Sequence, residues 1–226
     1  MCGRFTLTTD RDQIEERFSF RMTNVTLTPH YNIAPSQPVL SLMSDGKENR
    51  AGFLRWGLIP SWAKDEAIGN RMINARAETA AEKPSFRGAM RHRRCLVPAD
   101  GFYEWIGQPG AKRPHLLRPV KSGPMAFAGL WEHWLGPDGS EIETMAILTV
   151  PANAVAARVH DRMPVILAPE NFEAWLDISS GRSNPAETLL RPAADDLLEI
   201  LEVSPKLNNS RNEGPEAQVI IGKMLI

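Results

Sequence analysis

The chain has 226 residues, of which 42% are hydrophobic and 23% are charged, and its formal net charge is −1. This is an ordinary globular composition with enough apolar material for a core, and no apolar run approaches the roughly 18 residues that span a bilayer. A net charge near zero argues against a protein that binds nucleic acid by overall charge alone.

The first half of the chain predicts one short helix and several strands. Thr9 or Asp10 is expected to cap the helix, which places Ile14 and Phe18 four residues apart on one face. Apolar runs rich in β-formers predict buried strands at residues 39–43, 95–97, 102–106 and 115–117. A turn at residues 107–113 separates the last two strands.

The second half predicts a hairpin followed by short helices. Residues 125–131 and 143–150 are rich in β-formers and flank Gly136-Pro137-Asp138-Gly139, which is a hairpin turn signal. Another strand is expected at 163–167. Proline at a first helical turn then predicts two helices, from Pro169 to Leu176 and from Pro192 to Leu201.

Many strands with few, short helices predict an α+β fold that is mainly β, with a barrel-like or folded-over sheet and the helices at its periphery. Glycine and proline are scattered, and no repeat or linker interrupts the chain. We therefore expect a single domain over residues 1–226. The pattern does not predict its topology.

The cysteines and the N-terminus indicate the compartment. Met1 is followed by Cys-Gly-Arg and not by a basic region with an apolar core, so we expect no signal peptide and a cytoplasmic protein. Cys2 and Cys95 are too few for a disulfide framework. No CxxC or HxxxH spacing is present, so we expect neither a metal site nor a cofactor.

Positive charge is concentrated in one segment. Arg87, Arg91, Arg93 and Arg94 surround His92, and two further arginines lie just upstream. Such a cluster is typical either of a solvated helix face or of a surface that contacts phosphates. The sequence leaves both interpretations open.

Cys2 is the sharpest chemical feature. Removal of Met1 would leave an N-terminal cysteine, which has an α-amine and a thiol on adjacent carbons. An α-amine has a pKa of about 7.7–8.0, so roughly a tenth of it is neutral at pH 7 and can attack an aldehyde. The thiol can then add to the imine and close a thiazolidine ring. An abasic deoxyribose, which opens to an aldehyde, is the natural target.

Six motifs in order, the first of which contains Cys2, give the chain a family resemblance. They are Cys2-Gly3-Arg4-Phe5, Tyr31-Asn32-Ile33-Ala34-Pro35, the segment Arg55 to Trp62, Asn74-Ala75-Arg76-Ala77-Glu78-Thr79, the segment Cys95 to Trp105, and His160-Asp161-Arg162-Met163-Pro164. This set, over residues 2 to about 167, resembles the SOS-response-associated peptidase family, also called abasic-site processing proteins.

The resemblance implies a mainly β domain with a basic groove for single-stranded DNA that contains abasic sites. It also implies a covalent thiazolidine crosslink through Cys2 that protects the lesion during the DNA damage response. The family name implies a peptidase that removes its own Met1, and an imine intermediate makes weak lyase chemistry accessible. We expect a monomer without membrane or metal partners, associated with the nucleoid when it is bound to DNA.

The resemblance also implies roles for three further residues in catalysis. Asn74 would orient the sugar or phosphate, Glu104 would shuttle protons in a partly desolvated position, and His160 would protonate the sugar oxygen or the carbinolamine. Each has a structural alternative. Asn74 could cap a turn, Glu104 could pair with an arginine on the outer face of a strand, and His160 could simply support the fold.

Five residues are candidates for DNA contacts. Arg4, Arg76 and Arg162 could grip phosphates with two hydrogen bonds each, or could form structural ion pairs. Trp56 and Trp62 could stack on bases, whereas Trp105 and Trp131 are assigned to the core.

Three other functions compete with abasic-site capture. A glutamine amidotransferase with an N-terminal cysteine nucleophile also begins Met-Cys-Gly, but its later glycine-rich and Asn-Gly signatures are not found here. A non-covalent single-strand DNA-binding module would bind intact and abasic strands alike. A protease acting in trans would need a Ser/His/Asp arrangement that the sequence does not offer.

Overall fold

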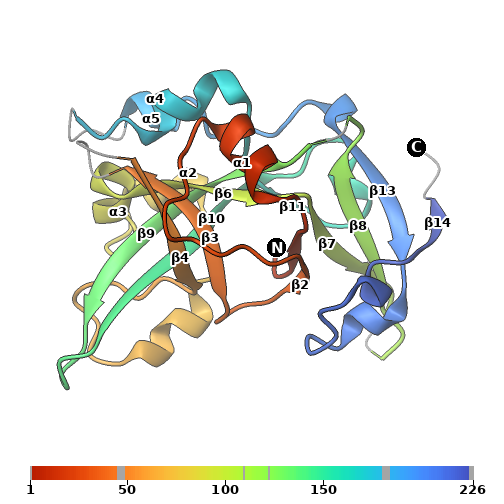
Figure 1. The fold of residues 1–226 in the computed structure, drawn as a ribbon, viewed down its shortest axis with the longest axis horizontal. Coiled ribbons are helices and arrows are strands. Elements are labelled where there is room, and N and C mark those ends of the chain that lie inside the picture. The colour runs from red at the N-terminus through yellow and green to blue at the C-terminus, as the bar shows by residue number, and fades with distance from the viewer. Residues whose placement is uncertain (1, 45–48, 109, 122, 180–183, 224–226) are drawn as a thin grey trace.

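The computed structural model describes residues 2–44, 49–108, 110–121, 123–179 and 184–223. Within this part, five strands close into a ring because β9 and β10 pair with each other as well as with β6 and β4. The ring strands are β3 (Pro38–Ser44), β4 (Asn49–Trp56), β6 (Arg94–Ala99), β9 (Met125–Leu135) and β10 (Glu141–Pro151). The barrel in the left half of Figure 1 is this ring.

Short strands extend the barrel at its rim. Strand β5 (Asn74–Arg76) runs parallel to β10, and β11 (Arg162–Pro164) pairs antiparallel with β10. Strand β12 (Ile166–Leu167) pairs with β9 instead. The strand expected at 163–167 is therefore divided, since Val165, between the two parts, donates its amide to Leu148 while the chain changes partner.

A second sheet curls beside the barrel, on the right of Figure 1. Its order is β14-β13-β8-β7-β1-β2. The strands are β1 (Phe5–Leu7), β2 (His30–Ile33), β7 (Gly101–Ile106), β8 (Arg113–Pro119), β13 (Leu198–Val203) and β14 (Ile220–Lys223). Strands β6 and β7 follow one another directly, so one continuous segment joins the barrel to this sheet.

Strand β1 lies where the two sheets meet. Phe5 is opposite Phe102 of β7 and Ile33 of β2 in the sheet, and its ring packs edge-on against Trp56 and Phe127 of the barrel. These aromatic contacts are buried in the main core cluster. The segment that precedes β1, which contains Cys2, is therefore anchored between the two sheets (Figure 1).

The helices are short and lie outside the sheets. They are α1 (Arg11–Phe18), α2 (Ala77–Ala80), α3 (Arg87–His92), α4 (Phe172–Leu176) and α5 (Asn184–Glu187). Short 3-10 turns are found at Glu66–Arg71, Ala156–Arg158, Pro169–Asn171, Asp195–Leu197, Pro205–Asn208 and Pro215–Ala217. As expected, the Asp10 side chain caps α1, in which Ile14 and Phe18 are buried. The mainly β fold with a barrel and peripheral short helices is confirmed.

The helix predicted from Pro192 to Leu201 is wrong. Only a 3-10 turn forms there, and the chain continues as β13, in which Ile200 lies opposite Leu117 of β8. Leu198, Ile200 and Val203 are buried. Pairing with β8 satisfies the backbone and buries these side chains, so tertiary context overrides the local helix signal. In the described residues, no helix is long and apolar enough to cross a membrane.

Candidate functional site

Asn74 holds the backbone of Cys2. Asn74 begins β5, whose parallel pairing with β10 places it opposite Ile147. Its side-chain Nδ2 donates to the Cys2 carbonyl oxygen at 2.7 Å. The Oδ1 atom of the same amide is buried and accepts no hydrogen bond from the described residues. Asn74 therefore fixes the N-terminal segment and keeps one acceptor available for a donor that approaches the site.

The thiol of Cys2 is enclosed by the protein. It is buried, and its Sγ lies at the long distance of 3.9 Å from the Arg4 carbonyl oxygen. Burial raises the pKa of the Cys2 thiol far above its ordinary value, and the nearby Glu104 raises it further. The thiol therefore keeps its proton at neutral pH, and a base must remove that proton before sulfur can act as a nucleophile.

Glu104 is a buried carboxyl group beside this thiol. It lies in β7 opposite His115 of β8, and only 6% of its surface is exposed. Burial raises its pKa to about 7, and the charge of Asp161 also raises it. A carboxyl group with this pKa is divided between its acid and base forms at neutral pH, so it is suited to exchange protons.

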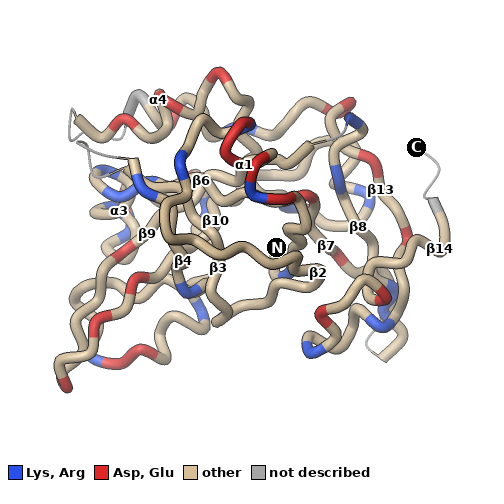
Figure 2. Tube along the Cα trace, in the orientation of Figure 1, with Lys and Arg blue, Asp and Glu red and all other residues tan. Residues whose placement is uncertain are grey.

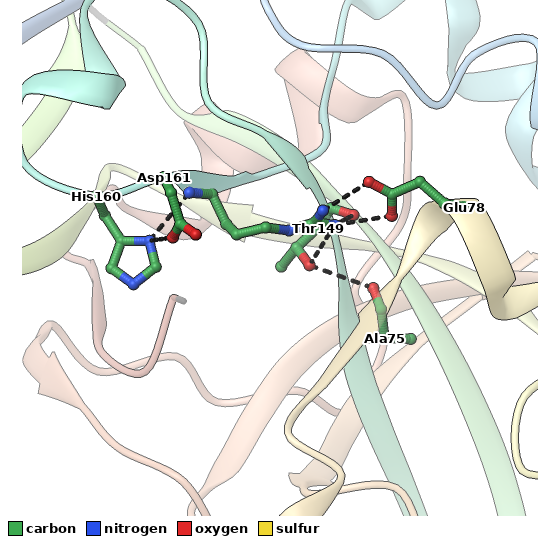
Figure 3. Close-up of polar contacts among 6 residues, drawn as sticks. Ala75, Glu78, Thr149, His160 and Asp161 are labelled. Atoms are coloured by element: carbon green, nitrogen blue, oxygen red, sulfur yellow. Dashed lines mark hydrogen bonds and ion pairs between the residues drawn. The ribbon is translucent and has the colours of Figure 1, made fainter.

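His160 lies in the loop between the 3-10 turn at Ala156–Arg158 and β11. Figure 3 shows its ring beside Asp161, whose Oδ1 is 2.7 Å from Nδ1. The same Nδ1 is 3.0 Å from the backbone nitrogen of Arg162. Burial lowers the pKa of His160, while Asp161 raises it. The side chain is 31% exposed, so the imidazole lies at an open edge of the site.

The four candidate catalytic residues thus approach one another from different elements. Asn74 donates a hydrogen bond to the Cys2 backbone, and the charge of Glu104 acts on the Cys2 thiol. The charge of Asp161 acts on Glu104, and its carboxylate contacts His160. The segment before β1, the rim strand β5, strand β7 of the second sheet and the loop before β11 converge at the junction of the sheets. The arrangement places a thiol, an amide, a carboxyl group and an imidazole within one region.

Arg162 is committed to a structural ion pair. Its guanidinium donates to both carboxylate oxygens of Glu78, at 2.6 and 2.9 Å, and also to the Thr149 carbonyl oxygen at 2.6 Å (Figure 3). Only 13% of its side chain is exposed. These bonds connect β11 to α2 and β10, so they fix the loop that contains His160.

Arg4 is also engaged within the protein. Its Nη1 donates to Asn32 Oδ1 at 2.7 Å and to the Leu207 carbonyl oxygen at 3.2 Å, and its guanidinium lies over the Trp105 ring. The Asn32 amide in turn donates to the Asn209 and Asn212 carbonyl oxygens. This network attaches the C-terminal loop to the segment that follows Cys2.

Arg76 and the two tryptophans differ in accessibility. Arg76 is exposed, and its side chain forms no hydrogen bond or salt bridge with any described residue, although its charge acts on Glu78; its guanidinium is therefore accessible to a ligand. Trp62 is 57% exposed. Trp56, in contrast, is fully buried, and its Nε1 donates to the Ile73 carbonyl oxygen at 2.8 Å. Stacking on a base would require an accessible ring face, so Trp56 is a core residue in this structure.

The basic cluster of the sequence is divided between surface and core. Figure 2 shows Lys and Arg positions gathered at α3. Arg94 is buried and donates to the carbonyl oxygens of Met90 and Trp175, whereas Arg93 pairs with Glu132. Arg87 and Arg91 remain exposed and line a cavity of about 270 Å³ next to Trp62.

Sequence reasoning missed the residues that support the site. Asp161, Glu78, Thr149 and Asn32 each bond to a predicted residue, but only the fold shows these contacts. Asp161, Glu78 and Asn32 lie inside the motifs quoted above, so their position in a motif could have indicated a role. Thr149 lies outside every motif, and nothing in the sequence pointed to it. In the described part of the chain, no group of three or more His, Cys, Asp or Glu residues could hold a metal ion.

Comparison with known proteins adds independent findings. The model of the family described as SOS response associated peptidase (SRAP) matches residues 1–210. The abasic site processing protein YoqW of Bacillus subtilis is 46% identical over 96% of this chain and 98% of its own length. The abasic site processing protein HMCES of Gallus gallus is 33% identical over 85% of this chain and 66% of its own length.

A solved structure agrees with the fold. An X-ray structure of a protein from Bacteroides thetaiotaomicron superposes with a TM-score of 0.86. The similarity covers 96% of this chain and 99% of that protein, at 26% sequence identity.

Proposed function

The chain belongs to the SOS response associated peptidase (SRAP) family, and from that premise we propose that it captures abasic sites in single-stranded DNA through a covalent bond to Cys2. The observation that supports this proposal best is the direct bond from Asn74 to the backbone of Cys2, next to a carboxyl group whose pKa is about 7. The names of the relatives indicate the substrate class.

The proposed reaction begins when Met1 is removed and the Cys2 α-amine becomes free. The amine attacks C1 of the ring-opened deoxyribose to give a carbinolamine, which loses one water to form an imine. The Cys2 thiol then loses its proton, and sulfur adds to the imine carbon while the imine nitrogen gains a proton. The product is a thiazolidine, which contains the atoms of protein and DNA less one water.

Glu104 and His160 would move the protons of this sequence. The buried thiol is a poor nucleophile until a base removes its proton, and the adjacent Glu104 carboxylate supplies that base at neutral pH. His160, at the open edge, protonates the leaving hydroxyl of the carbinolamine. Asn74 presents its unbonded Oδ1 to a hydroxyl of the sugar. Fast ring closure by sulfur would suppress β-elimination, so lyase activity should be weak.

Single-stranded DNA would reach the site across the exposed cationic and aromatic residues. Arg76 follows Asn74 by two residues and has an exposed guanidinium. Trp62 offers an accessible ring, and stacking on a base is worth about 1–3 kcal/mol. Arg4 and Arg162 hold internal bonds, so they would act on DNA only by their charge or after rearrangement. Trp56 is buried and therefore has no part in the proposed DNA contacts.

The experiment incubates the protein with an oligonucleotide that contains a single abasic site, after intact mass has shown that Met1 is absent. Denaturing electrophoresis and mass spectrometry should show a one-to-one adduct lighter than the summed masses by one water. The Cys2→Ser variant should lose the heat-stable adduct. The Cys95→Ala variant is the matched control, because Cys95 is equally buried but lies inside the barrel wall.

Three outcomes would overturn the proposal. A Cys2→Ser adduct as stable as the wild-type adduct would exclude the thiazolidine. Equal, salt-sensitive binding of intact and abasic strands without an adduct would indicate a non-covalent binding module. Glutamine hydrolysis without any reaction toward abasic DNA would indicate an amidotransferase.

If the protein retains Met1 when it is made in cells but loses it in the purified state, the chain itself has the proposed peptidase activity.

A further inference from the structure

Two groups compete for one nitrogen of His160. The Nδ1 atom is 2.7 Å from Asp161 Oδ1 and 3.0 Å from the backbone nitrogen of Arg162. Figure 3 shows both contacts on the same edge of the ring, with the second ring nitrogen directed away from them. A ring nitrogen has either one lone pair or one proton in the ring plane, so it cannot make both bonds at once.

The two contacts select different forms of the imidazole. The Arg162 amide is a donor, so it requires an unprotonated Nδ1 and places the proton of the neutral ring on Nε2. The Asp161 carboxylate is an acceptor, so it requires a proton on Nδ1. In that form Nε2 is unprotonated in the neutral ring and carries a transferable proton in the imidazolium. Only the state bonded to Asp161 therefore lets Nε2 exchange protons with a substrate.

We propose that Asp161 is a positioning residue for His160, and that its carboxylate and the Arg162 amide form a two-position switch for the imidazole proton. This inference rests on the proposed role of His160 in abasic-site capture. When His160 takes up a proton, Nδ1–H donates to Asp161, and Nε2–H faces the carbinolamine hydroxyl. After Nε2 has given that proton to the leaving water, the ring remains neutral with its proton on Nδ1, ready to accept another.

The exposure of Asp161 is compatible with this role. Its side chain is 85% exposed, so the carboxylate can turn to solvent when the Arg162 amide bonds to Nδ1. Arg162 has no such freedom, because Glu78 and the Thr149 carbonyl oxygen fix its side chain. The fixed amide and the movable carboxylate thus compete from the same loop.

Other charged groups act on the same switch. The carboxyl group of Glu104, on β7, interacts electrostatically with Asp161. The Arg162 guanidinium and the positive charge of the N-terminal amine both oppose protonation of His160. Asp161 is the acid in direct contact with the ring among the described residues, so its removal should favour the Arg162-bonded state.

The test compares Asp161→Ala with Asp161→Glu, which restores a carboxylate, and with Asp12→Ala, which removes an exposed aspartate from α1. Single-turnover crosslinking to an abasic oligonucleotide is followed from pH 5 to 9. Imidazole ¹⁵N shifts of the DNA-free proteins report which nitrogen of His160 is protonated. Asp161→Ala should crosslink at least about tenfold more slowly at pH 7. The part of its pH–rate profile that depends on protonation of His160 should move to lower pH.

The nuclear magnetic resonance spectra should show a lower pKa of His160 in Asp161→Ala, with the proton of the neutral ring on Nε2. Asp161→Glu should recover part of the rate and part of the Nδ1–H form, and Asp12→Ala should match the wild type. Unchanged rate, pH profile and ring protonation in Asp161→Ala would overturn the inference while leaving abasic-site capture intact. If wild type forms no adduct, the proposed function fails, yet the spectra still decide whether Asp161 sets the proton position.

Discussion

Replacement of Glu104 by glutamine should change how stability depends on pH. The Glu104 carboxyl group is 6% exposed, and burial raises its pKa from the ordinary 4.5 to about 7. The folded protein therefore holds this proton more tightly than the unfolded chain does. Between pH 4.5 and about 7 the folded state binds more protons, so this group lowers the free energy of unfolding as pH rises through that window, and its effect levels off above it.

The size of the effect follows from the pKa difference. At about 1.36 kcal/mol for each pKa unit, the difference between 4.5 and about 7 corresponds to about 3 kcal/mol. Glutamine has nearly the same shape and no titration, so Glu104→Gln lacks this loss. The stability of the variant relative to wild type should accordingly rise by about 3 kcal/mol between pH 4.5 and 8.

Urea denaturation followed by circular dichroism at several pH values measures this difference, with intact mass confirming the same N-terminus in both proteins. Glu132→Gln is the matched control. Glu132 is also 6% exposed and has a raised pKa, but it pairs with Arg93 at 3.2 Å. Its pH-dependent change should have the same sign and be smaller. A flat difference curve for Glu104→Gln, or one that falls with pH, would refute the claim that the carboxyl group is desolvated.

Three further predictions separate contact residues from structural ones. Trp62→Ala should weaken single-stranded DNA binding by about 1–3 kcal/mol without altering the melting temperature. Trp56→Ala should instead lower the free energy of unfolding by about 3–5 kcal/mol, because Trp56 is buried. The reverse pattern would contradict the burial of Trp56. Arg76→Ala should reduce the salt dependence of DNA binding by about one phosphate contact and change stability by less than about 0.5 kcal/mol, and an unchanged salt slope would remove Arg76 from the DNA path. Arg162→Ala should cost about 2 kcal/mol in chemical denaturation because it breaks the bonds to Glu78 and the Thr149 carbonyl oxygen, and a neutral result would show that this pair is dispensable.

The sequence predicted most strands well because the pattern of apolar residues that marks a strand lies within the strand itself. Alternating or continuous apolar residues predicted β3, β6, β7, β8 and the β9–β10 hairpin, whose turn contains Gly139 at a φ of 86°. The stretch that becomes β4 has no such signal: Asn49 and Arg50 are exposed, and the strand forms because it pairs with β3 along its whole length. The helix predicted at Pro192 failed for the same reason, since β8 provides a partner that the sequence does not show.

The candidate site follows the same division. The sequence alone singled out Cys2, because an aminothiol at the start of a chain has distinctive chemistry whatever the fold. The motifs also selected Asn74, Glu104 and His160 as residue types suited to orient a substrate and to move protons. Neither observation shows how close these groups lie, because Asn74, Glu104 and His160 are 72 to 158 positions from Cys2 and their proximity to it depends on strand pairing.

Only the tertiary structure decided which groups are available. It buried Trp56 and Arg94, occupied Arg162 with Glu78, and left Arg76 and Trp62 accessible, although all are large side chains that suit a DNA surface. It also enclosed Glu104, which moves its pKa to about 7. The sequence thus determined the chemical groups and most strands, whereas burial and partner choice, which arise only when the two sheets meet, determined the proton affinity and the freedom of each group.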